Sequence, residues 1–191
     1  METSPDASFL YAAIEDLQGT VRALDIKAEV LLVAMTVPLY DASGIAATLS
    51  KLLREGLVGF RILTAIIVLW IALAWIAAFI ATFRVLVASH NPSDAIPDHA
   101  PAKGSFFAGH LFKFTRKDLI RDRLVTCSHT LRQHLDELPT GDEQVKAELA
   151  FEHLKLAFIC SRKIAMFNFA VRLMTAGVYA SVLLLILHIV S

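Results

Sequence analysis

The sequence has only two cysteines among 191 residues, Cys127 and Cys160. They form no CxxC motif and no framework of several disulfides, which argues against a disulfide-stabilised secreted scaffold. We expect reduced thiols in packed helices. The charges of the 18 basic and 18 acidic residues cancel. The chain therefore lacks the excess of positive charge that would predict a nucleic-acid partner.

Motifs for catalysis and metal binding are also missing. The seven histidines include no i,i+4 pair, so we expect no metal site. The sequence contains no nucleophile elbow, no HExxH motif and no glycine-rich phosphate loop. We therefore assign no catalytic residue, and we expect a protein that is not an enzyme and has no cofactor.

Apolar residues are abundant, at 56% of the chain, which indicates a small membrane protein. The clearest transmembrane helix is predicted at 61–84, where the uncharged run ILTAIIVLWIALAWIAAFIATF lies between Arg61 and Arg84. The amino terminus lacks the succession of basic, apolar and small residues that is typical of a cleaved signal peptide. We therefore expect the membrane segments to direct their own insertion.

The tail of the chain contains no proline after Pro139. A continuous helix from Thr140 to Val190 would be roughly 75 Å long, more than twice the roughly 30 Å hydrocarbon core of a bilayer. We place a transmembrane helix at 166–190, with Arg172 at its inner boundary. The first half of the tail is then expected to stand in water.

The first part of the chain predicts an amphipathic cytoplasmic helix at 1–22 and a weak transmembrane helix at 23–45, which contains Pro38 and Asp41. Two placements of this span compete. If it begins at Val30, Asp41 lies near the membrane midplane, as a pore or gating candidate. If it begins near Ala23, Asp41 reaches the outer surface, which avoids a buried charge and is the placement we favour.

The segment 88–163 is predicted to be a cytoplasmic helical domain, because it holds most of the basic residues outside the spans. Within it, Thr115 and Asp118 fit a capping box that opens a helix through to Leu138. Thr140 and Glu143 repeat that pattern at the start of the tail helix. The predicted fold is thus an all-α membrane protein with three transmembrane helices, the first of them uncertain, and a cytoplasmic domain between the second and third.

Three short motifs resemble the transmembrane effectors of the Pycsar (pyrimidine cyclase) antiphage resistance system. LDIKAEVLL at 24–32 resembles the family's A-D-x-K-A element, with leucine where alanine is more frequent. SFFAGHL at 105–111 is similar to its F-F-G-x-I/L patch, with one extra alanine. ICSRKIAMFNFAVRLMTAG at 159–177 is similar to its leader into the last span.

The resemblance implies a multi-pass protein of the bacterial inner membrane that responds to a cyclic pyrimidine mononucleotide, cyclic UMP or cyclic CMP. The response would impair membrane integrity and abort the phage infection. The alternative from a different class is a membrane-anchored helical scaffold or partner-binding subunit without a ligand. We also expect a homo-oligomer in the lipid bilayer, because three short helices cannot line a sizeable aqueous path.

Two groups of charged residues are candidates for function. The basic stretch at 113–123 suits the phosphate of a nucleotide, although a solvated helix face against anionic lipid is the more frequent use of such a run. A second group is predicted at the inner membrane boundary, with Lys163 opposite Lys27. It would couple the soluble domain to the membrane, or simply anchor the helices by snorkelling. The nucleotide candidates are Arg116, Lys117, Arg121 and Arg123, and the candidates for the coupling junction are Asp25, Lys27, Arg162 and Lys163.

Overall fold

The computed structural model describes residues 5–54, 58–87, 92–97, 102, 104, 111 and 127–190. Helices make up the regular structure of these residues, and none of them lies in a strand, so the all-α prediction is confirmed. The chain divides into two compact units: unit 1 is Met1–Gly19 with His90–Ile159, and unit 2 is Thr20–Ser89 with Cys160–Ser191. The helices α1 (Pro5–Thr36) and α6 (Asp142–Val190) each contribute residues to both units.

Helix α1 has the predicted amphipathic pattern but a different end. Its apolar positions Leu10, Ile14 and Leu17 are half-buried, whereas Glu15 and Asp16 are exposed, which is the expected helical periodicity. The helix then continues without a break into the segment where we placed the first span, 23–45.

The regular helix ends at Thr36, inside that predicted span. Proline disfavours helical backbone in the residue before it, and Pro38 lies in the short 3-10 helix η1 (Val37–Asp41) that follows. Asp41 is the last residue of η1, directly before α2 (Ala42–Arg54). The segment 23–45, where we placed the weak first span, is therefore not one regular helix, and its crossing of a membrane stays a prediction.

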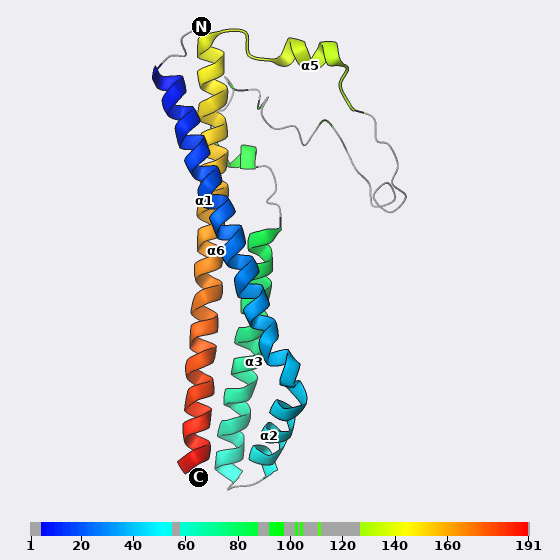
Figure 1. Ribbon diagram of the computed structural model, residues 1–191, viewed down its shortest axis with the longest axis vertical. Coiled ribbons are helices and arrows are strands. Elements are labelled where there is room, and N and C mark those ends of the chain that lie inside the picture. Colours follow the sequence, from blue (N-terminus) through cyan, green and yellow to red (C-terminus); the bar gives the residue numbers. More distant parts are fainter. Residues whose placement is uncertain are drawn as a thin grey trace. The chain divides into compact units, whose positions relative to one another are not determined.

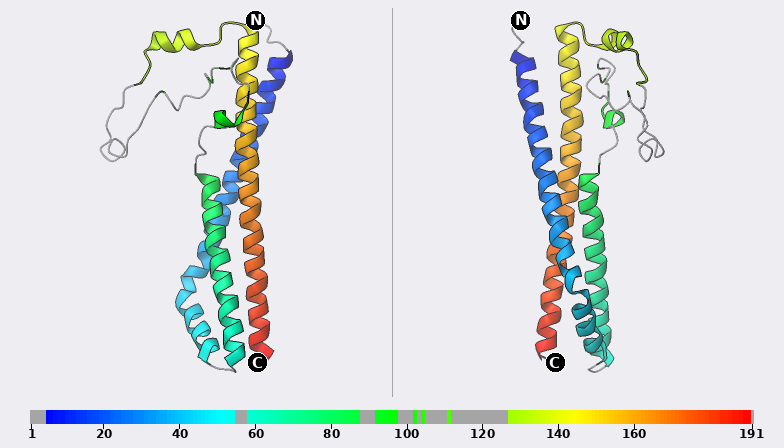
Figure 2. Two further views of the ribbon diagram at one scale, coloured as in Figure 1. Left: turned by 180° about the vertical axis from the view of Figure 1, so that it is seen from behind. Right: turned by 45° about the vertical axis from the view of Figure 1, so that its right-hand side comes forward.

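Unit 2 consists of the later part of α1, then η1, α2, α3 (Val58–Leu86) and the later part of α6. Figure 1 and Figure 2 show α3 running in the opposite direction to α1 and α6, with α2 beside α3. The α3 side chains that are buried are small or β-branched, which lets the helices approach closely. They are Thr64, Ala74, Ala78, Ala81, Thr82 and Val85.

Among the described residues, two helices are long and apolar enough to cross a membrane, Val58–Leu86 and Asp142–Leu187. The first contains the predicted span 61–84. At about 1.5 Å per residue, the length of its 29 residues exceeds the thickness of the hydrocarbon core of a bilayer. Its outer surface exposes large apolar side chains, a pattern typical of a helix in lipid. They include Ile62, Leu63, Ile66, Leu69, Trp70, Leu73, Ile76, Phe79 and Phe83.

In unit 1, the expected helix ending at Leu138 is much shorter in its described part. Residues 127–130 are not helical, and α5 runs only from Leu131 to Glu137. Thr130 and Gln133 form the capping box at its start, so this pair provides a helix signal that we had overlooked. The capping box predicted at Thr115 and Asp118 lies outside the described residues.

Helix α6 is continuous over 49 residues, which confirms the long tail helix and corresponds to roughly 74 Å. Its start differs from our prediction. The Gly141 carbonyl accepts the first helical hydrogen bond, from Val145 N, at 3.0 Å. The backbone N–H and hydroxyl of Thr140 both donate to the side chain of Gln144, at 3.0 and 3.3 Å, so Gln144 takes the role we gave to Glu143.

Candidate functional site

The charged pair in unit 2 joins α1 to α6. The ammonium of Lys163 donates to a carboxylate oxygen of Asp25, and 138 positions separate the two residues in sequence. The Lys163 side chain is 10% exposed and that of Asp25 is 33% exposed. A pair with so little access to water depends on both partners, because either charge alone would remain partly desolvated.

Helix periodicity explains why these two side chains face each other. Leu24 and Ala28 on α1 are buried, and Asp25 lies beside that buried stripe. On α6, Lys163 falls between the buried residues Cys160 and Ala170, three and seven positions apart from it, and such spacings place side chains on one helix face. The fold therefore directs both charges into the contact between the helices.

The other two residues of the predicted junction are placed differently. Lys27 and Arg162 are both exposed, and the partner of Lys163 is Asp25, where we had expected Lys27 to lie opposite. The reason is geometric: positions 25 and 27 differ by about 200° around a helix of 3.6 residues per turn. The four predicted nucleotide-binding residues, Arg116, Lys117, Arg121 and Arg123, lie outside the described residues.

Unit 1 contains a second group of buried charges on α6. Glu148 is 4% exposed and Lys155 is 3% exposed. A Glu148 carboxylate oxygen accepts a hydrogen bond from Gly104 N at 3.2 Å. The Lys155 ammonium pairs with Glu152 and lies 4.9 Å from the centre of the Phe151 ring, a favourable cation–π distance. The Gly104–Glu148 hydrogen bond attaches Gly104 to α6, whereas the contacts of Lys155 lie within α6.

A more exposed pair connects the first turns of α1 and α6 within unit 1. The Lys146 ammonium lies 3.3 Å from Glu143 and 3.4 Å from Asp6. The Glu143 carboxylate, with a smaller contribution from Asp6, raises the pKa of Lys146 above its ordinary value. The side chains of Asp6 and Glu143 are largely exposed, so these ion pairs add little stability.

The match to a known family covers nearly all of this arrangement. The sequence model of the Pycsar effector protein domain matches residues 9–190, which includes α1, α3, α6 and the Asp25–Lys163 pair. The chain belongs to the Pycsar effector family. No protein of curated function and no solved structure matches it.

As a Pycsar effector, the protein acts in antiphage defence downstream of the cyclase, and its two apolar helices associate it with a membrane. Among the described residues, no group of three or more His, Cys, Asp or Glu side chains could hold a metal ion. Cys127 is exposed, Cys160 is buried, and neither forms a disulfide. In the effector's apolar unit, the Asp25–Lys163 pair is a long-range contact between ionisable side chains.

The buried group around Glu148 and Lys155 was not predicted from the sequence. We had expected the first half of the tail helix to stand in water, because the helix is more than twice as long as the bilayer core is thick. A signal was nevertheless present: Glu148, Phe151, Glu152 and Lys155 recur at spacings of three and four and so share one helix face.

Proposed function

We propose that this Pycsar effector is a multi-pass inner-membrane protein that binds a cyclic pyrimidine mononucleotide, cyclic UMP or cyclic CMP, and then impairs the membrane, causing abortive infection. Family membership supports the defence role. Helix α6 supports the membrane mechanism: it is one uninterrupted helix, with residues up to Ile159 in unit 1 and residues from Cys160 in apolar unit 2. A change in α6 caused by the ligand would therefore involve the membrane helices.

The course of the chain in unit 2 supports three membrane crossings. Only residues 55–57 separate the end of α2 from the start of α3, so these ends lie close together. The later part of α1, with η1 and α2, therefore makes one crossing of the unit. Helix α3 then runs back in the opposite direction and makes the second crossing (Figure 2). Helix α6 makes the third crossing. Excess Lys and Arg in 88–163 favour a cytoplasmic position for that segment and for the amino terminus.

The Asp25–Lys163 pair is the observation that carries the coupling step. It attaches α6 to α1 three residues after Cys160, where α6 enters unit 2, so displacement of α6 must move α1 or break the pair. A partly desolvated ion pair has two distinct arrangements, paired and separated, and can thus act as a switch. The basic residues at 116, 117, 121 and 123 remain our proposal for the phosphate site.

A thermal-shift screen of the purified protein tests nucleotide binding. Cyclic UMP or cyclic CMP should raise the melting temperature, because a ligand that binds only the folded state stabilises it by mass action. Cyclic AMP and cyclic GMP have the same cyclic phosphate and a purine base, so they test whether the pyrimidine base is required. Linear UMP tests whether the cyclic phosphate is required. If no cyclic pyrimidine nucleotide shifts the melting temperature, the ligand-gated function is wrong and a membrane scaffold is the better explanation.

A further inference from the structure

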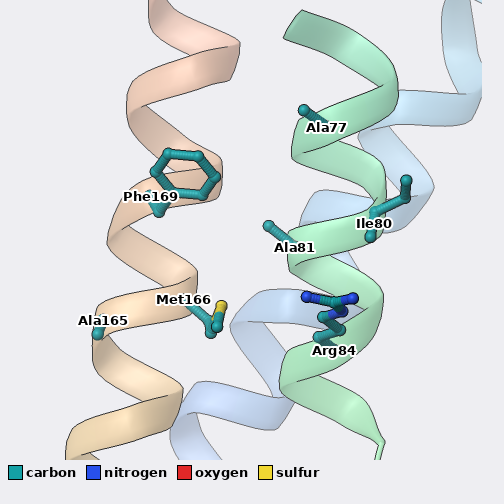
Figure 3. A pocket seen from close by; sticks show the side chains of 7 residues that line it. All are labelled: Ala77, Ile80, Ala81, Arg84, Ala165, Met166 and Phe169. Atoms are coloured by element: carbon teal, nitrogen blue, oxygen red, sulfur yellow. The ribbon is translucent and has the colours of Figure 1, made fainter. Parts of the chain in front are cut away.

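A pocket of about 450 Å³ lies between α3 and α6 within unit 2 (Figure 3). In Figure 3, Ala81 and Met166 point toward each other across it, and Arg84 is at the same end as Ala165. The lining is apolar except for a single arginine. Its residues are Ala77, Ile80, Ala81, Arg84, Ala165, Met166 and Phe169.

The apolar part of this pocket has the chemistry of a hydrocarbon-binding groove. Short alanine side chains leave room between the helices, and Met166 and Phe169 supply larger apolar walls on the α6 side. Within a bilayer, the hydrocarbon at hand is an acyl chain.

The two helices also place positive charge at one end of the pocket. Arg84 is in the last turn of α3 and is exposed. Arg162, also exposed, lies three residues before Ala165 and four before Met166, on the same face of α6. Neither arginine has an acidic side chain within 4 Å among the described residues.

We propose that this pocket binds one anionic phospholipid, with its phosphate between Arg84 and Arg162 and one acyl chain along the apolar wall toward Phe169. Guanidinium groups bind phosphate through paired hydrogen bonds, and basic pockets between membrane helices on the cytoplasmic side recognise anionic head groups. The proposal rests on the membrane placement of α3 and α6 argued above. A cyclic nucleotide would leave the hydrocarbon part of the groove unused.

Native mass spectrometry of the full chain in detergent tests this site without any nucleotide, so the result does not depend on the signalling function. Dioleoyl phosphatidylglycerol and dioleoyl phosphatidylcholine have identical chains and differ in head-group charge. The wild type should retain the anionic lipid at concentrations about ten-fold lower: both head groups carry a phosphate, but only phosphatidylcholine also carries a quaternary ammonium, which the two guanidinium groups repel. The double variant R84Q/R162Q should lose this preference.

Two further variants separate the lipid site from general attraction to positive charge. Arg22→Gln removes the same charge from an exposed position on α1 that does not line the pocket, and it should keep the preference. Ala165→Phe fills the groove from an exposed position, and it should weaken binding of both lipids. Excess glycerol 3-phosphate should not displace the lipid, since it lacks the chain.

Three results would overturn the proposal. The first is equal retention of the two lipids by the wild type. The second is an undiminished anionic preference in R84Q/R162Q. The third is efficient displacement by glycerol 3-phosphate, which would assign the site to a free phosphate and not to a lipid.

Discussion

The two units use charge differently. In unit 1, buried charges are close in sequence or contact backbone: Lys155 pairs with Glu152 one turn away, and Glu148 accepts from Gly104 N. In unit 2, small apolar residues fill the described helix contacts, and Lys163 reaches Asp25 on a different helix. Unit 1 also has a long-range pair, Lys146–Asp6, but its side chains are more exposed to solvent than those of Asp25 and Lys163, and exposed pairs contribute little. The less exposed pair of unit 2 is therefore better suited to a switch.

The largest effect on stability should come from the core of unit 1. Leu149 is 1% exposed, and Leu149→Ala should destabilise this unit by about 2–5 kcal/mol through lost burial and a residual cavity. Hydrogen exchange measured by mass spectrometry should show faster exchange in 142–159. Equal acceleration in α3 would contradict the division into two units.

Removing either partner of the Asp25–Lys163 pair should destabilise unit 2 to different extents. Asp25→Asn leaves an ammonium that is 10% exposed without its carboxylate, whereas Lys163→Met leaves a carboxylate that is 33% exposed. We expect a loss of about 2–3 kcal/mol for the first and about 1–2 kcal/mol for the second, below the roughly 3–5 kcal/mol of a fully buried pair. Chemical unfolding in detergent would measure both losses, and the reverse order would refute the burial argument.

A matched lysine substitution sharpens the same point. Lys27→Met removes the same charge from α1, at an exposed position with no acidic partner among the described residues. Its effect on unfolding should stay within about 0.5 kcal/mol, as for most surface changes. A loss equal to that of Lys163→Met would restore our original expectation for Lys27.

A modest effect on the stability of unit 1 is expected for Gly104→Ala. Gly104 has a φ of +75°, where a side chain costs about 1–2 kcal/mol. The new Cβ would lie 3.4 Å from Phe151 Cε1, an ordinary contact, so strain and not collision is the expected cause. A thermal melt should show a modest decrease, and an unchanged melting temperature would mean that this segment adds little to unit 1.

The sequence was sufficient for the features that depend on long periodic patterns. The uncharged run after Arg61 became α3, and the proline-free tail became α6. The first span was less predictable, because a continuous apolar composition concealed the helix end that Pro38 causes. The family motifs around Leu24 and Lys163 consist of residues that are adjacent in the chain, so they can be recognised from the sequence without a structure. The match to the Pycsar effector family supports this recognition.

Other details required the packed structure. Whether Asp25 or Lys27 meets Lys163 depends on the rotation of α1, which changes by about 100° per residue. The burial of Glu148 comes with a hydrogen bond from Gly104 N, 44 positions away in the sequence. Such contacts join residues far apart in sequence, and a helical pattern alone does not specify them.

Dye release from proteoliposomes is the most direct test of the central claim. The account predicts that cyclic UMP or cyclic CMP causes rapid release with the wild type. With Lys163→Met it should cause little release, although that variant still binds the nucleotide in a thermal-shift assay. Release that is independent of nucleotide, or undiminished in Lys163→Met, would contradict a nucleotide-gated effector coupled through the Asp25–Lys163 pair.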